Sequence, residues 1–103
     1  MTSNVAKCLL VSKVLVADGM VTDDERAFLD DVMRKLGLTD IERRSVIALE
    51  GLDQALPFVQ ALPLEEKEAL VDLLVDAASA DGHLSPHELG TVKRVAAALG
   101  VKR

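Results

Sequence analysis

The stretch ADGMVTDDE at residues 17–25 occurs a second time, with changes, as ADGHLSPHE at residues 80–88. A helical pattern that ends in Leu-Gly and an aliphatic residue follows each copy, so residues 17–38 align with residues 80–101 without a gap. Seven of the 22 aligned positions are identical: an alanine, an aspartate, a glycine, a glutamate, a valine, a leucine and a second glycine. We interpret this pattern as an internal duplication.

The composition indicates one small domain, residues 1–103, with an aliphatic core. Half of the residues are hydrophobic, and Phe28 and Phe58 are the only aromatic residues. A chain of this length buries roughly 65% of its unfolded surface, which is enough for a core without disulfides. Proteins that stack bases on their surface usually present more aromatic rings. We therefore expect Ala, Leu and Val to pack between helices.

The charge balance disfavours a nucleic-acid partner. The formal net charge is −5, whereas binding to phosphates requires a basic face. Residues 53–88 contain eight acidic residues and a single basic residue, Lys67. An acidic surface attracts cations or basic partners, although it is more often only the solvated face of a protein.

The single cysteine and the hydropathy pattern predict a cytoplasmic protein. Cys8 cannot form an internal disulfide, and its apolar surroundings in the sequence suit a small buried side chain. Lys13 interrupts the apolar segment near the N-terminus and only Lys7 precedes it, which disfavours a signal peptide. No run approaches the about 20 apolar residues of a membrane span.

Hydrophobic periodicity predicts six helices and no strand. The first, residues 5–17, is apolar on nearly all sides, which is typical of a helix in the middle of a bundle. The others are expected over residues 22–36, 39–49, 53–61, 64–80 and 85–99. We expect two helical hairpins, residues 5–38 and 68–101, to pack about a pseudo-twofold axis, with the third and fourth helices bridging them.

Helix-start signals precede three of these helices. Thr22, Thr39 and Ser85 are each followed three residues later by a glutamate, which is the pattern of a capping box. A proline also follows Ser85 at the first helical position. The hydrophobic residues expected to face the core in the second and third helices are Phe28, Leu29, Val32, Met33, Leu36, Ile41, Val46 and Ile47.

Each copy of the repeated stretch carries half of a calcium-binding pattern. Asp-Gly-x-hydrophobic-x-x-x-Glu corresponds to the second half of an EF-hand loop. The first and third ligand positions, however, fall on Val14 and Val16 in one copy and on Ala77 and Ser79 in the other. Because calcium affinity follows the number of oxygen ligands, such a degenerate EF-hand should bind calcium weakly or not at all.

A looser cation site is the second candidate. Its ligands would be the carboxylates of Asp18, Glu25, Asp81 and Glu88. His83 and His87 could add imidazoles, which suit a transition metal such as zinc, but the spacing matches no established zinc motif. A divalent cation is the only cofactor that the sequence suggests.

The same residues also have a purely structural interpretation, to which we give more weight. The two glutamates complete capping boxes, and aspartates in turns bond their own backbone. A cap contributes about 0.5 to 2 kcal/mol, which is enough to retain these residues through a duplication.

Catalytic motifs are missing from the sequence. It has no Gly-x-Ser-x-Gly elbow and no phosphate-binding loop, and Cys8 lies far in sequence from both histidines. Ser79, Asp81 and His83 are neighbours in sequence only, which does not make a triad. We expect no enzymatic activity; a small hydrolase built on His83 or His87 is a third hypothesis.

The twofold Ala-Asp-Gly, Thr/Ser-x-x-Glu and Leu-Gly pattern, with an aliphatic helix before each copy, resembles the TerB-like tellurite-resistance family and the related N-terminal domain of DjlA-type co-chaperones. The resemblance covers essentially the whole chain. It implies an all-α bacterial cytoplasmic module of stress-response systems that often work near the membrane, and it suggests cation binding at the four carboxylates named above.

The leading hypothesis is therefore a non-enzymatic, six-helix TerB-like bundle that acts through protein partners, with a candidate divalent cation on its acidic motif. Any association with the membrane would be peripheral and through a partner. The alternative is a structural scaffold or dimerisation domain in which the repeat serves only to cap helices.

Overall fold

The computed structural model describes residues 1–17, 19, 21–80, 82 and 85–102, and these residues form six helices and no strand. The helices are α1 (Ser3–Leu15), α2 (Asp23–Lys35), α3 (Asp40–Ile47), α4 (Leu52–Gln60), α5 (Leu64–Ala78) and α6 (Pro86–Leu99). The predicted all-α fold is confirmed.

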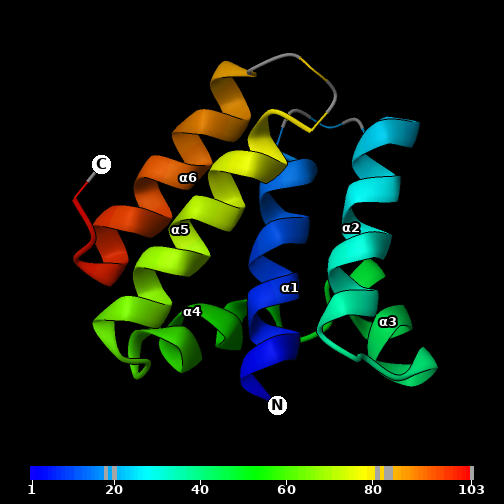
Figure 1. The fold of residues 1–103 in the computed structure, drawn as a ribbon, viewed down its shortest axis with the longest axis horizontal. Coiled ribbons are helices and arrows are strands. Elements are labelled where there is room, and N and C mark those ends of the chain that lie inside the picture. The colour runs from blue at the N-terminus through cyan, green and yellow to red at the C-terminus, as the bar shows by residue number, and fades with distance from the viewer. Residues whose placement is uncertain (18, 20, 81, 83–84, 103) are drawn as a thin grey trace.

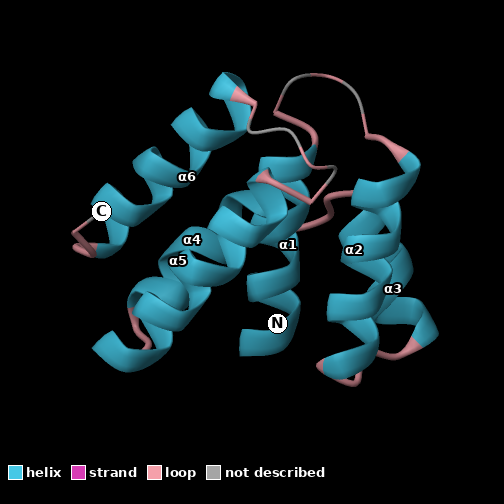
Figure 2. Ribbon diagram, turned by 45° about the horizontal axis from the view of Figure 1, so that its top comes forward, coloured by secondary structure: helices cyan, strands magenta, loops and turns pink. Residues whose placement is uncertain are grey.

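Helix α1 occupies the centre of the bundle. It contacts each of the other five helices. Figure 1 shows α5 and α6 on one side of α1 and α2 and α3 on the other, with α4 crossing one end. Figure 2 shows the same arrangement from another direction, with α6 and α3 on opposite sides of the molecule.

The residues of α1 explain this position. Its buried residues lie on all sides of the helix axis: Val5, Ala6, Cys8, Leu9, Leu10, Val11, Ser12, Val14 and Leu15. Helix α1 begins two residues earlier than predicted because the hydroxyl of Thr2 accepts a hydrogen bond from the Val5 amide at 3.2 Å. A helix buried all round is the element that the other helices must enclose.

The predicted helix caps are present. The Thr22 hydroxyl accepts from the Glu25 amide at 3.2 Å, and the Thr22 amide donates to Glu25 Oε1 at 2.9 Å. Thr39 and Glu42 repeat both bonds at the same distances. The Ser85 hydroxyl caps α6. Because these signals are local in sequence, sequence analysis could identify them.

Equivalent glycines in the two halves have equal backbone angles. Gly19 and Gly82 both have φ +83°, and Gly37 and Gly100 both have φ +73°. Residues other than glycine rarely adopt these left-handed angles. This agreement supports the interpretation of an internal duplication.

The prediction that Ile41 and Ile47 are buried in the third helix is wrong. Ile41 is 75% exposed and Ile47 is 46% exposed, whereas Val46 is fully buried. The three residues cannot face the core together, because at about 100° per residue Ile41 lies about 140° from Val46 around the helix and Ile47 about 100°. A short helix on the outside of the bundle buries one narrow stripe.

No helix in the described part of the chain has the length and apolar character needed to cross a membrane.

We predict that the thiol of Cys8 is unreactive in the folded protein. Cys8 is fully buried, and burial, followed by the charge of Glu42, raises its pKa from 9.0 to about 11. Alkylation by iodoacetamide at mildly alkaline pH, followed by mass spectrometry, should therefore be much slower in native buffer than in guanidinium chloride. Equal rates would contradict the burial of α1.

The raised pKa of Cys8 also makes the stability of the folded protein depend on pH. Because the folded pKa lies above the unfolded value, the contribution of the Cys8 thiol to stability is fully present below pH 9.0 and is lost as the pH rises through about 11. A Cys8→Ala variant should lack this alkaline loss, which provides the control.

Candidate functional site

The two repeated glutamates are buried at one end of the bundle. Glu25 is 1% exposed and Glu88 is 2% exposed. Each lies in the first turn of its helix, α2 or α6. The first turns of both helices lie at the same end of the molecule, at the top of Figure 1. The sequence predicted these residues as site candidates, but it did not indicate that they are buried.

Glu25 uses only one carboxylate oxygen in the capping box. Its Oε1 accepts the Thr22 amide at 2.9 Å. Its Oε2 is buried and has no hydrogen-bond partner among the described residues. The positive end of the helix dipole favours the carboxylate, but a buried charged oxygen without a bonding partner is unfavourable. The cap of α2 therefore leaves one carboxylate oxygen of Glu25 unused.

The other two predicted ligands, Asp18 and Asp81, lie outside the described residues, as does His83. His87 is exposed in the first turn of α6. The described residues contain no group of three His, Cys, Asp or Glu side chains placed to hold a metal ion. The cation site therefore stays a prediction.

The first half of the EF-hand pattern has helical structure. Val14 and Ala77, at the first ligand positions, are fully buried helical residues. The hydroxyl of Ser79 donates to the backbone carbonyls of Val75 and Asp76 at 3.2 and 3.3 Å. These positions offer no oxygen ligands comparable to those of a calcium loop.

Chemistry at Cys8 is not favoured by its surroundings. Burial raises the pKa of the thiol to about 11, so the thiolate needed by a nucleophile is scarce at neutral pH. The predicted grouping of Ser79, Asp81 and His83 lies partly outside the described residues, and the carbonyls of α5 engage the Ser79 hydroxyl.

A groove between α2 and α5 was not predicted. It consists of two adjoining hollows of about 260 and 170 Å³ that share Leu36 and Leu73. The first hollow is also lined by Phe28, Asp31, Val32, Lys35 and Asp76, and the second by Lys7, Glu66, Ala69 and Leu70. We call these residues together the α2–α5 groove.

The sequence predicted Phe28 and Leu36 as inward-facing, but they are only partly buried against the core, as is Leu73. The acidic character of residues 53–88 was the available signal for this groove. A separate hollow, the corner pocket, lies beside the first repeated stretch. Ser12, Leu15, Val16, Val21, Arg26, Leu29 and Ile47 line it, and its volume is about 140 Å³.

Comparison with known proteins identifies the family. The family model for the tellurite resistance protein TerB matches residues 4–103, which is nearly the whole chain. None of the curated proteins or solved structures that were compared matches the chain. The match agrees with the resemblance of the repeated motif and with the all-α fold, and the chain therefore belongs to the TerB tellurite-resistance family.

Proposed function

We propose that this chain is a non-catalytic TerB-family module that acts through protein partners and binds a divalent cation at the carboxylates of its two repeated stretches, residues 17–25 and 80–88. The observation that carries the cation is the buried Oε2 of Glu25, which has no partner among the described residues. Family membership favours a cytoplasmic stress-response or tellurite-resistance system, with any membrane association occurring through a partner.

The chemistry of Glu25 favours a hard cation. A carboxylate that is 1% exposed needs a compensating charge or hydrogen bonds on both oxygens. Oxygen ligands of this kind suit calcium, magnesium or manganese, which retain water molecules in their remaining positions. We assign Asp18 as the second ligand of the first repeated stretch, together with Glu25. Asp81 and Glu88 are the corresponding ligands of the second stretch.

A third capping box provides a natural control. Glu42 makes the same two bonds with Thr39, at 2.9 and 3.2 Å, but this box is exposed to solvent. Capping is therefore common to Glu25 and Glu42, whereas burial is not. Glutamine at either position retains an oxygen that can accept the cap bond and removes the charge.

We predict that cation binding is lost in the double variant Glu25→Gln/Glu88→Gln and kept in Glu42→Gln. Isothermal titration with calcium, magnesium, manganese and zinc at millimolar concentration measures this directly. At a cation concentration of 100 Kd, one site should stabilise the folded protein by about 2.7 kcal/mol. The double variant should lose this stabilisation, and a chelator should abolish the difference from wild type.

Two results would contradict the cation site. One is the absence of a binding signal when the wild-type protein is titrated with each of the four cations. The other is a loss of stability in the double variant that is the same with and without chelator, which is the behaviour of the alternative function, a structural scaffold whose glutamates only cap helices.

The α2–α5 groove is the face that we assign to a protein partner. Its apolar side chains Phe28, Leu36 and Leu73 are only partly buried. Helix α5 carries five acidic residues and one basic residue, and α2 carries five acidic and three basic residues. The groove therefore has an apolar floor and a lining with more acidic residues, Asp31, Glu66 and Asp76, than basic ones, Lys7 and Lys35. Such a surface is complementary to an amphipathic helix with basic flanks.

The lysines at the groove do not reverse this charge. Lys35 Nζ lies 3.0 Å from Asp31 Oδ2, and Lys7 Nζ lies 3.7 Å from Glu66 Oε1. Each lining lysine is thus already beside a carboxylate. The groove residues of α5 run from Glu66 to Asp76, over about 15 Å, so a partner helix of about four turns would extend over the whole groove.

We predict that a peptide of about four turns, with leucines spaced at i, i+3, i+4 and i+7 and lysines on its other faces, binds the chain in a salt-dependent manner. Fluorescence anisotropy should show binding weakened at least about tenfold by Leu73→Asp, because this substitution places a charge on the groove floor. Ile41→Asp, on the exposed face of α3, should leave binding unchanged.

A scrambled peptide of the same composition provides the second control, and equal binding of it would overturn the groove assignment. Sedimentation tests the competing occupant, a second copy of the chain. A dimer of wild type that Leu73→Asp dissociates would favour the dimerisation hypothesis instead.

A further inference from the structure

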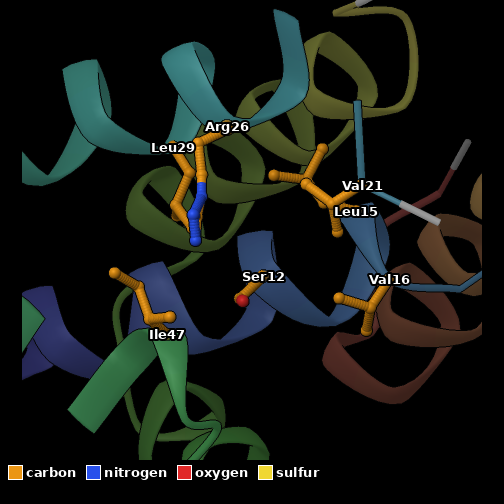
Figure 3. Close-up of a pocket in the computed structure, with 7 residues that line it drawn as sticks. All are labelled: Ser12, Leu15, Val16, Val21, Arg26, Leu29 and Ile47. Atoms are coloured by element: carbon orange, nitrogen blue, oxygen red, sulfur yellow. The ribbon is translucent and has the colours of Figure 1, made fainter. Parts of the chain in front are cut away.

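The corner pocket combines apolar walls with two polar groups. Figure 3 shows its lining residues, which come from the end of α1, the segment before α2, the first half of α2 and the end of α3. Five of the seven are aliphatic, and two of these, Val21 and Ile47, are 44% and 46% exposed. Exposed aliphatic side chains around a hollow are typical of a ligand-binding site rather than of a hydrophobic core closed to solvent.

The first polar group is the guanidinium of Arg26. Its side chain extends from α2 toward the space between Ser12 and Ile47 (Figure 3). Among the described residues, Lys35 pairs with Asp31 and Lys7 pairs with Glu66. Arg26 forms no ion pair with any of these residues. An arginine without a carboxylate partner in a chain of net charge −5 is available to bind an external anion.

The second polar group is the hydroxyl of Ser12. Ser12 is 4% exposed and lies on α1 among residues that are otherwise apolar. Its side chain lines the pocket, as Figure 3 shows. A serine hydroxyl at this position can donate a hydrogen bond to a ligand oxygen.

The second half of the chain lacks both polar groups. In the alignment of residues 5–38 with 68–101, Ser12 corresponds to Val75 and Arg26 to Leu89. Ile47, the wall contributed by α3, has no counterpart. The second hairpin therefore has aliphatic residues at both equivalent positions. Ser12 and Arg26, two of the many positions at which the halves differ, line the same pocket.

We propose that the corner pocket binds a carboxylate attached to a compact apolar group, such as the C-terminal residue of a peptide chain or a short branched acid. Arg26 would hold the carboxylate in a bidentate pair, and Ser12 would donate to one of its oxygens. The apolar group would lie against Leu15, Leu29 and Ile47. This proposal is independent of the cation and of the α2–α5 groove.

The size of the pocket limits the apolar group. A buried cavity of about 150 Å³ holds one benzene molecule, and the corner pocket has about 140 Å³. The apolar group therefore has about six non-hydrogen atoms or fewer, which includes the side chains of leucine, isoleucine and valine. For a ligand of this size the expected Kd is about 1 mM.

Ligand-observed NMR with N-acetyl-leucine tests the proposal on the wild-type protein. N-acetyl-leucinamide lacks the charge and acetate lacks the apolar group, so each should bind at least about tenfold more weakly. Comparison with 4-methylpentanoate separates the two sources: a chain terminus requires tighter binding of N-acetyl-leucine, and a free acid requires tighter binding of 4-methylpentanoate.

The matched variant is Arg26→Leu, which introduces the residue of the second half. It should fold with an unchanged circular dichroism spectrum and bind the acid and the amide equally. The proposal is overturned if the wild type does not prefer the acid to the amide, or if Arg26→Leu keeps that preference. The first comparison needs no variant, so the outcome does not depend on how the variant folds.

Discussion

The burial of α1 on all sides is the constraint on which the rest of the structure depends. Nine of its 13 residues are buried, and they surround the helix axis. Fully burying one large aliphatic side chain contributes about 1.5 to 3 kcal/mol, so leaving either side of α1 open would remove much of the core. Its hairpin partner α2, together with α3, α4, α5 and α6, encloses it.

The chain reversals after α1 and α5 follow from this enclosure. Helices α1 and α5 end at the same end of the bundle, where the chain must reverse direction (Figure 1). Glycines with φ +83° and N-capping hydroxyls make both reversals. The glutamate of each cap is then covered by neighbouring residues. Capping and cation binding are compatible at Glu25 because the cap occupies one carboxylate oxygen only.

Much of the fold could be predicted because its signals are local. The threonine and glutamate of each box and the glycine stops lie within a few residues of the helix ends that they determine. The burial of α3 could not be predicted in the same way. Whether Ile41, Val46 or Ile47 faces α1 depends on how α3 lies against the bundle, and only Val46 does.

The surface sites illustrate the same limit of local information. The sequence singled out Glu25 and Glu88, but not their burial, and its other two ligands, Asp18 and Asp81, lie outside the described residues. The groove and the corner pocket each combine residues from separate helices, so their existence depends on packing. Even so, the replacement of Val75 and Leu89 by Ser12 and Arg26 in the first half was visible in the aligned repeats.

Native-state hydrogen exchange measured residue by residue tests the central position of α1 most directly. If α1 is enclosed by all the other helices, its amides should exchange only through global unfolding and should be the slowest in the protein, well behind those of the outer helix α3. Exchange of α1 as fast as that of α3 would contradict the account.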